Sequence, residues 1–267
     1  MTASPKWSPE QLTRLASAQR PRTVDAHSHC LPGLDDGPPT LMAALALCEL
    51  LVSDGTTTAI ATPHQLGAYD GATSAAVIRA AVGALNHELA VAGIPLEIVP
   101  GADVRVDERL PQLLDADRVL TLADARQHLL LELPHELYVD PLPTIHMLGE
   151  RGIQAILTHP ERYRYLPPST AAVAEWVAAG AAVQLTAGSL LGDFGARANQ
   201  QAWRLVHAGL VSLVASDAHD CRGRSPRLGE ALAVLETEIG IHGARTMCLE
   251  NPWRVLQGLD LSPCRPR

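Results

Sequence analysis

The sequence predicts an α/β protein: a distorted seven-stranded barrel of the (β/α)7, TIM-like kind, with a mainly parallel sheet. Three observations predict this fold class. Short apolar or β-branched runs alternate with longer helical patterns along most of the 267 residues, as in parallel sheets whose strands are joined by helices. Seven such runs are enough to close a barrel. Side chains of metal-ligand type stand at or just after the ends of these runs, where barrel enzymes carry their active sites.

The first half of the chain begins with an extension and then enters the alternating pattern. We expect residues 1–21, with a helix-capping sequence at Ser8 and a break at Pro21, to lie outside a single domain that spans residues 22–267. The expected elements are a strand over 23–27, a helix over 40–52, a strand over 56–62, a helix over 74–92 and a strand that starts over 96–99. Residues 105–128 are the least regular part and suggest a loop and a hairpin.

Regular alternation returns after residue 128. The runs of Leu, Ile, Val and Ala in this half are short enough for buried strands, and each precedes a helical pattern. The expected strands are 129–133, 153–158, 182–186 and 211–215. The expected helices are 142–151, 170–179, 195–208 and one near 227–238, followed by a helical turn that opens at Asn251.

Composition restricts the classes of protein that the chain can be. Hydrophobic residues make up 47% and charged residues 19% of the chain, as in globular proteins with a sizeable core. A net charge of −8 and only one Phe, four Tyr and four Trp argue against a nucleic-acid-binding surface. No apolar run approaches the ~20 residues of a membrane span, and the N-terminus lacks a signal-peptide core. Five cysteines without C-x-x-C spacing indicate free thiols. We therefore expect a cytoplasmic protein without membrane insertion.

The clearest chemical signal is the pair of histidines at the end of the first strand. Residues two apart in a strand point to the same face, so His27 and His29 present two imidazoles side by side. Glu132 stands inside an apolar run, where a buried carboxylate needs a metal or another partner. The candidate ligands at or near strand ends are His27, His29, Asp36, His64, Asp103, Glu132, His159, Asp217 and His219. Nine N and O ligands suit two or three ions better than one.

Each candidate alone has an ordinary explanation. His64 could cap a loop, Asp36 could stand in a turn and Asp217 could cap a helix, since Asp and Asn commonly serve turns. Nine such coincidences at one face of a barrel would be required, and we therefore interpret the set as a metal centre.

The same residues carry a family resemblance. The motifs are Asp25-Ala26-His27-Ser28-His29, Gly33-Leu34-Asp35-Asp36-Gly37, Ala61-Thr62-Pro63-His64, His159-Pro160-Glu161-Arg162, Ala215-Ser216-Asp217-Ala218-His219, Gly192-Asp193-Phe194-Gly195 and Asn251-Pro252. They resemble those of the polymerase-and-histidinol-phosphatase (PHP) family. Within it they are most similar to the manganese-dependent protein-tyrosine phosphatases of bacterial capsule and exopolysaccharide operons.

The resemblance implies a PHP-type barrel that holds three divalent metal ions, most commonly manganese, with iron or zinc as alternatives. The implied ligand sets are His27, His29, Asp103 and Asp217 for the first ion, Asp103, Glu132 and His159 for the second, and Asp36, His64 and His219 for the third. Asp103 would bridge the first two ions. The family usually has Glu at this position, so the bridging arm in this chain is one methylene shorter.

Two arginines complete the expected site. Arg162 and Arg224 follow candidate ligands closely, and the resemblance matches both to arginines that hold phosphate. Guanidinium groups bind phosphate oxygens bidentately, which supports this role independently. Residues 221–227 also satisfy the C-x5-R pattern of cysteine-dependent phosphatases. Asp220 precedes that cysteine and would raise the pKa of the thiol, which disfavours it as a nucleophile.

The expected function is that of a metal-dependent phosphomonoesterase that hydrolyses phosphotyrosine in proteins through a metal-bridging hydroxide. The resemblance implies a bacterial tyrosine kinase tail as the partner and a role in regulating exopolysaccharide synthesis. Three alternatives stay open: a small-molecule phosphatase such as histidinol-phosphate phosphatase, an amidohydrolase-like enzyme, and a non-catalytic phosphotyrosine-binding metallo-barrel. Arg162 and Arg224 argue against the amidohydrolase.

Overall fold

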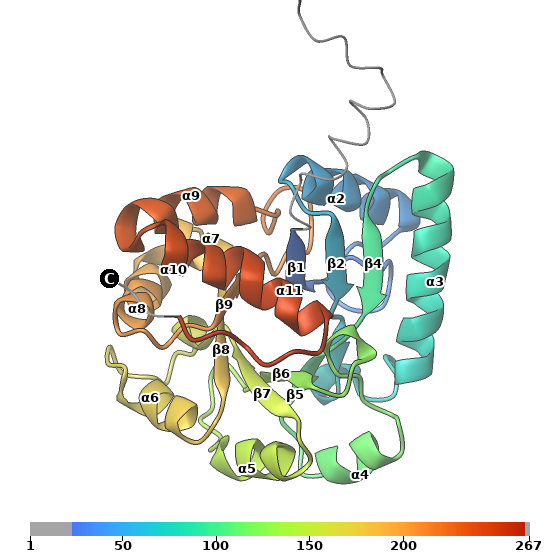
Figure 1. The fold of residues 1–267 in the computed structure, drawn as a ribbon. Coiled ribbons are helices and arrows are strands. Elements are labelled where there is room, and N and C mark those ends of the chain that lie inside the picture. Colours follow the sequence, from blue (N-terminus) through green and yellow to red (C-terminus); the bar gives the residue numbers. More distant parts are fainter. Residues whose placement is uncertain (1–22, 265–267) are drawn as a thin grey trace, which may run out of the picture.

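The computed structural model describes residues 23–264, in which helices surround a centre of short strands (Figure 1). The expected extension and its capping sequence at Ser8 lie outside the described residues. The strands are β1 (Val24–Ser28), β2 (Thr58–Ala61), β3 (His64–Gln65), β4 (Glu97–Pro100), β5 (Asp103–Arg105), β6 (His128–Glu132), β7 (Gln154–Thr158), β8 (Ala182–Thr186) and β9 (Leu213–Ala215). The helices are α2 (Leu41–Ser53), α3 (Ala75–Ala92), α4 (Leu110–Asp115), α5 (Leu142–Glu150), α6 (Ala171–Ala178), α7 (Ala187–Leu191), α8 (Gly195–His207), α9 (Leu228–Ile239), α10 (Ile241–Arg245) and α11 (Asn251–Leu256).

Every pair of neighbouring strands within residues 23–264 is parallel, which confirms the α/β class with parallel sheets. The strands form two sheets, ordered β1-β2-β4 and β3-β5-β6-β7-β8-β9. These described strands are not joined into one closed sheet, so the predicted seven-stranded barrel is not seen as such.

The difference from the predicted strand count has a local cause. The second predicted strand, over 56–62, corresponds to β2, and a further short strand, β3, follows after Pro63. The third, starting over 96–99, corresponds to β4, and another short strand, β5, follows after Gly101. Proline has no N–H to donate to a strand ladder. A Cβ atom at Gly101 would lie 2.7 Å from Cγ2 of Ile60, so the chain crosses close to β2 at this point. Each interruption moves the chain from the first sheet to the second.

The first and last strands approach each other at their C-terminal ends. The backbone N–H of His29 donates to the carbonyl of Ala218, and the N–H of Asp217 donates to the carbonyl of His27, each at 2.8 Å. Ser28 and Ala218 form an isolated parallel bridge between them. The end of β1 and the segment after β9 are therefore held together.

The segment over residues 105–128 corrects a prediction. It contains the short helix α4 and a 3-10 turn, and no hairpin is present among the described residues. Pro111 stands in the first turn of α4, where a missing N–H costs nothing, and Leu110 and Leu114 bury one side of the helix. The helix begins at Leu110 and accommodates the proline in its first turn.

Helix α3 is long and apolar enough to cross a membrane by length and composition alone. Ser74 accepts a hydrogen bond at its N-terminus and Gly93 ends it in the left-handed conformation. The helix lies along the outside of β4 (Figure 1), with Ile78, Leu85 and Leu89 buried in the core. This one-sided burial is that of an outer helix of a globular domain.

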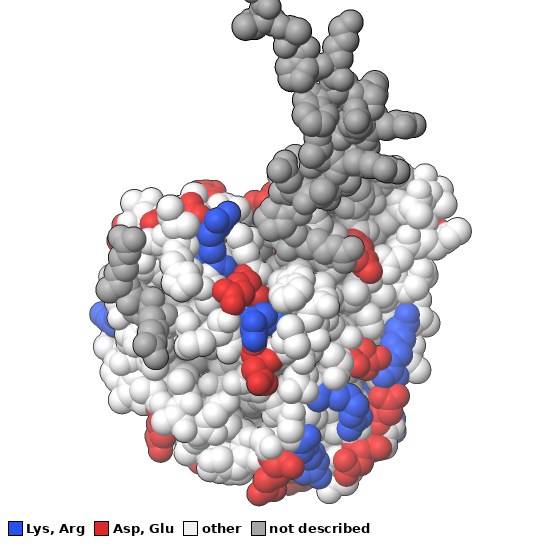
Figure 2. Space-filling model, in the orientation of Figure 1, with Lys and Arg blue, Asp and Glu red and all other residues white. Residues whose placement is uncertain are grey.

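The core has two layers. The larger layer lies between the helices and the outward faces of the strands, and it includes Leu129 and Leu131 of β6. The smaller layer contains Leu130 of the same strand, with apolar side chains of five further strands and Val255 of α11. Because alternate residues of a strand face opposite sides, Glu132 shares the inner face of Leu130. The face shown in Figure 2 carries acidic and basic side chains in mixed order.

Candidate metal centre

Most candidate ligands stand at or just after the C-terminal ends of strands, whereas His64 begins β3 and Asp103 begins β5. Two of them, His159 after β7 and Asp217 after β9, have φ angles of 34° and 53°. Non-glycine residues rarely adopt this left-handed conformation, and functional sites are one place where such residues cluster. The turn places His159 directly after β7 and Asp217 two residues after the end of β9.

His27 and His29 face each other, as predicted from their spacing. Their Nε2 atoms lie 3.1 Å apart. Each ring is held from behind, because Nδ1 of His27 lies 3.1 Å from Oε1 of Gln184 and Nδ1 of His29 lies 2.6 Å from Oδ2 of Asp35. An outer partner on Nδ1 leaves Nε2 free to bind a metal ion.

Gly37 positions the loop that carries the acidic pair after β1. A Cβ atom at this position would lie only 2.5 Å from the carbonyl oxygen of His29, so only glycine allows the loop to fold so closely against the end of the strand. The N–H of Gly37 also donates to Oδ1 of Asp35. The loop thereby directs Asp35 behind His29 and Asp36 toward other imidazoles.

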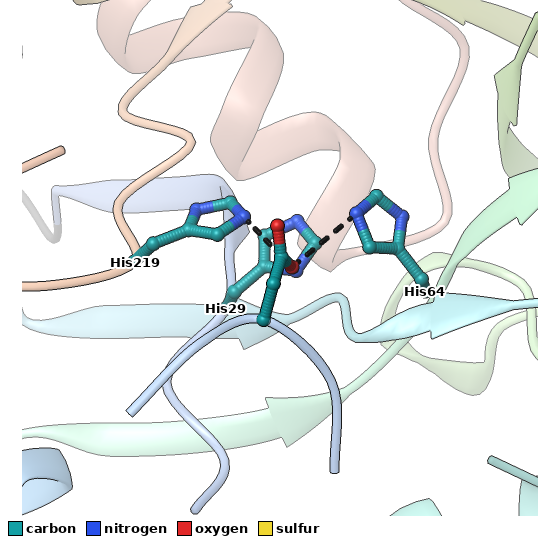
Figure 3. A group of neighbouring side chains, drawn as sticks. His29, His64 and His219 are labelled. Carbon is teal, nitrogen blue, oxygen red and sulfur yellow. Dashed lines mark ion pairs between the residues drawn. The ribbon is translucent and has the colours of Figure 1, made fainter. Parts of the chain in front are cut away.

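Asp36 is surrounded by histidines. Its Oδ1 lies 3.5 Å from Nε2 of His64 and 3.3 Å from Nε2 of His219, and Figure 3 shows these rings and His29 arranged around one point. The ligand atoms of the four residues all lie within 4.8 Å of one another. The structure thus brings together the set predicted for the third ion and adds His29.

Asp217 divides its two oxygens between imidazoles and arginines. Oδ1 lies 3.3 Å from Nε2 of His27 and 3.6 Å from Nε2 of His29. Oδ2 accepts hydrogen bonds from Arg162 at 2.5 Å and from Arg224 at 2.7 Å. Both predicted arginines therefore converge on the edge of the cluster.

The remaining candidates form two groups that share Glu132. One group is His64, Asp103 and Glu132, and the other is Glu132 and His159 with His135, which was not predicted. Asp103 also lies 3.8 Å from Nε2 of His27. The structure brings all nine predicted side chains together. The carboxylate shared by the last two groups is Glu132, whereas the resemblance implied that Asp103 would be the shared one.

Burial governs the ionisation of the cluster. Loss of water lowers the pKa of His27 to about 4 and keeps the pKa of His29 and of His159 well below the usual value, so these rings are neutral at pH 7. Burial and neighbouring carboxylates raise the pKa of Asp103 well above its usual range. Burial acts on Asp217 as well, but the adjacent imidazole and guanidinium groups outweigh it and hold its pKa well below the usual value.

The donor atoms fit divalent metal ions. Several are buried without a hydrogen-bond partner among the described residues: both oxygens of Asp103, Oδ1 of Asp217, Nδ1 of His159 and Nε2 of His219. Buried polar atoms are normally paired. Neutral imidazoles beside carboxylates suit zinc, iron or manganese, and a bound ion would satisfy these atoms.

Sequence reasoning missed several supporting residues. Asp35 and Gln184 orient imidazoles, and Asp25 accepts a hydrogen bond from the N–H of Ser216, tying β1 to the end of β9. Gln184 had a usable signal, because it is a polar residue inside the apolar run of β8, as Glu132 is in β6. Arg105, which lies 3.0 Å from Glu132, stands in the segment that was interpreted as irregular.

The C-x5-R pattern gains no support from the structure. Partial burial and Asp220 raise the pKa of the Cys221 thiol above its usual value. Arg227 forms ion pairs with Asp193 at 2.5 Å and with Glu230 at 2.8 Å, so its charge is already matched. All five cysteines are free thiols.

A groove of about 490 Å³ borders the cluster. It is lined by His135, Glu136, Arg162, Arg164, Phe194, Arg197 and Ala198. The guanidinium carbon of Arg162 lies 4.4 Å from the centre of the Phe194 ring, a cation–π contact that fixes the arginine at the end of the groove. Arg164 is paired with Glu136 at 3.2 Å, but the three arginines outnumber this one carboxylate, so the groove lining carries a net positive charge beside the candidate ligands.

The fold and the cluster define an α/β protein with a donor set suited to several divalent ions. Comparison with known proteins identifies the family to which the chain belongs. Residues 23–257 match the family model described as capsular polysaccharide synthesis, CpsB/CapC. The chain belongs to this family.

Individual relatives agree with the family assignment. The chain is 36% identical over 221 residues to the tyrosine-protein phosphatase YwqE of Bacillus subtilis, covering 81% of this chain and 85% of the relative. It is 29% identical to a putative tyrosine-protein phosphatase CapC of Staphylococcus aureus, covering 75% and 78%. A solved structure from work on YwqE of Bacillus subtilis and CpsB of Streptococcus pneumoniae, described as metal-dependent tyrosine phosphatases, matches with a TM-score of 0.86 at 32% identity. It covers 91% of this chain and 99% of that one.

Proposed function

We propose that this protein is a metal-dependent protein-tyrosine phosphatase that acts on phosphotyrosine proteins in capsule or exopolysaccharide synthesis. The observation that carries the proposal is the convergence of Arg162 and Arg224 on Asp217 at the edge of a buried cluster of imidazoles and carboxylates. The names of the family's relatives support it. A bacterial tyrosine kinase tail would be the partner, and the cytoplasm, where the free thiols would stay reduced, its compartment.

The finer features of the fold belong to the same proposal. The two sheets together would form the distorted PHP-type barrel of a single domain over residues 22–267, with residues 1–21 as an extension. The ligand sets would hold up to three ions, manganese foremost, with iron or zinc as alternatives. Four carboxylates against three divalent ions would leave about two positive charges, which would attract a phosphomonoester dianion to an acidic protein.

Divalent ions held by the cluster would supply Lewis acidity and activate the attacking water. The chain's own side chains orient the imidazoles and bind the phosphoryl group. Asp35 and Gln184 keep two imidazoles turned toward the centre. Arg162 and Arg224 would bind the equatorial oxygens of the phosphoryl group as charge develops on them. Phe194 holds Arg162 in position through its ring face.

The shape of the groove beside Arg162 favours a protein as the substrate. It is open to solvent and wide enough for a side chain that reaches in from a peptide. A tyrosine phosphate would place its phosphoryl group at the arginines and its ring in the groove. Phenolate is a good leaving group, so the reaction makes modest demands on a proton donor.

The test is a comparison of substrates and of inactivation treatments on the full chain. We expect turnover of a phosphotyrosyl peptide to exceed that of histidinol phosphate, to be abolished by chelation and to return with manganese. Cys221→Ser should retain activity, because its thiol lies outside the cluster. Preference for histidinol phosphate would favour a small-molecule phosphatase. Binding of the phosphopeptide without turnover by the manganese-loaded protein would favour the non-catalytic alternative.

A further inference from the structure

His135 stands on the loop after β6, three residues beyond Glu132, and points back toward the metal centre. Its Nε2 atom lies 3.4 Å from Oε1 of Glu132. This atom is buried and has no hydrogen-bond partner among the described residues. The ring meets His159 edge-on, with centroids 5.1 Å apart and an interplanar angle of 89°. The imidazole of His135 therefore lies beside two candidate ligands.

The separation from Glu132 suits two ligands of one ion better than a hydrogen bond. An N–H···O hydrogen bond spans about 2.7–3.2 Å. Two ligands at about 2.1 Å from a tetrahedral ion are about 3.4 Å apart. The ligand atoms of Glu132, His135 and His159 all lie within 4.8 Å of one another, which is compatible with a single ion between them.

The other oxygen of Glu132 faces a different group. Oε2 lies 3.6 Å from Nδ1 of His64 and 3.0 Å from a nitrogen of Arg105. His64 in turn lies 3.5 Å from Oδ2 of Asp103. The Glu132 carboxylate therefore spans two donor groups, and Asp103 belongs to only one of them.

We propose that His135 is the third protein ligand of the ion held by Glu132 and His159, and that Glu132 is the carboxylate shared with the neighbouring ion. The proposal rests on the metal centre of the proposed function and deepens it. It replaces the arrangement implied by the family resemblance, in which Asp103 bridges and His135 has no role. The short arm of Asp103 leaves a coordination position that His135 fills.

Metal binding tests the proposal without recourse to activity. The variants are His135→Ala and His135→Gln, with His146→Ala on the exposed side of α5 as the matched control. Each protein is stripped, titrated with Mn²⁺ by calorimetry, and analysed for bound manganese after dialysis. We expect the native chain and the control to agree. Both His135 variants should bind one ion at least ~10-fold more weakly and retain fewer ions per chain.

The glutamine variant separates a ligand from a supporting hydrogen bond. Gln carries an amide N–H that can still donate to Glu132, but it lacks an imidazole nitrogen. If His135→Gln keeps the native manganese affinity while His135→Ala loses it, His135 only orients Glu132 and the proposal is wrong. If both variants bind manganese with the native affinity, the proposal is also wrong. Melting of the stripped proteins checks that the variants fold.

The outcome is independent of the reaction assigned to the chain. Hydrolysis of the phosphotyrosyl peptide is measured on the native protein alone. A native protein that binds manganese but does not hydrolyse the peptide contradicts the proposed function, and the titrations still decide the role of His135. An active native protein with unaffected His135 variants contradicts only the ligand assignment.

Discussion

Individual residues of the centre are controlled by partners behind them. The imidazole of His29 is turned by Asp35 and that of His27 by Gln184, while Arg162 is held against Phe194. These contacts fix ring orientation and guanidinium position before any ligand arrives, and this reduces the ordering cost of binding. The chemistry therefore depends on side chains that would not themselves touch the substrate.

Arg162→Lys should lower kcat/KM for a phosphotyrosyl peptide by ~10-fold or more, which is at least ~1.4 kcal/mol of transition-state stabilisation. Lysine keeps the positive charge but loses the planar fork and the stacking on Phe194. Manganese content should not change. Arg151→Lys, at an exposed ion pair with Asp115, is the control. Unaltered kinetics in Arg162→Lys would make this arginine a surface charge.

His128 gives a pH prediction away from the candidate ligands. It is 1% exposed at the start of β6, and burial lowers its pKa to about 4, against 6.5 in the unfolded chain. The unfolded state therefore binds the proton more readily between these values. Neutral His128 therefore makes its full contribution to the free energy of unfolding above pH 6.5. This contribution is lost as the pH falls toward 4, and the loss reaches up to about 3 kcal/mol.

Urea unfolding of metal-free protein at pH 7, 5.5 and 4.5 measures this effect. His128→Gln should reduce the fall in unfolding free energy over this range, whatever its effect at pH 7. The other histidines are common to both proteins, so the difference in slope isolates His128. Parallel slopes would show that His128 titrates normally.

At the scale of elements, the N-terminus of α9 depends on a distant residue. Its N-cap residue, Arg227, makes no capping hydrogen bond with its side chain. Asp54, just after α2, accepts hydrogen bonds from the N–H groups of Leu228 at 2.6 Å and Gly229 at 3.2 Å. This carboxylate satisfies orphan donors of the helix and lies at the positive end of its dipole.

Asp54→Ala should lower the free energy of unfolding by about 1–2 kcal/mol, because α9 loses its cap. Asp54→Asn should retain most of the stability, since the amide oxygen can still accept. Asp115→Ala, at an exposed aspartate on α4, should change stability by less than about 0.5 kcal/mol. Equal losses in Asp54→Ala and Asp115→Ala, measured by chemical denaturation, would contradict a capping role.

The elements also show what the sequence could predict. The long helices and the strands β1, β6, β7 and β8 were predicted because their apolar patterns span whole elements. The short strands β3 and β5 were missed because two or three residues carry no periodicity. Pro63 and Gly101 were visible signals of the interruptions, but which sheet each fragment joins depends on packing that pattern alone does not contain.

The same limit applies to the centre. The proximity of the nine candidate side chains could be predicted because parallel strand ends gather at one face, and this needs only the order of elements. Their grouping could not be predicted, since it depends on which ligand atoms lie within a few ångströms of one another, and the sequence pattern does not give such distances. His135 was missed because it lies in a loop, where no strand end marks its direction.

For the whole molecule, metal binding should be coupled to stability. Buried oxygens and nitrogens without partners, such as those of Asp103 and His159, destabilise the metal-free fold. Manganese at about 100 times its dissociation constant adds about 2.7 kcal/mol per site. Stripping should therefore lower the melting temperature by roughly 5–10 °C per ion lost.

Differential scanning calorimetry of stripped and reloaded protein measures this shift. Calcium is the matched control, because it prefers all-oxygen ligands and should restore little. A melting temperature independent of manganese would mean that the cluster does not bind the ion in the folded state.

The hydrogen bonds between His29 and Ala218 and between Asp217 and His27 have a consequence for biosynthesis. They join the first strand of the described chain to a segment that the ribosome makes almost two hundred residues later. Until that segment emerges, a nascent chain holds exposed histidines and carboxylates without their partners. The candidate donor groups that include Asp217 or His219 can therefore assemble only late in synthesis, and a product truncated before residue 217 would lack them.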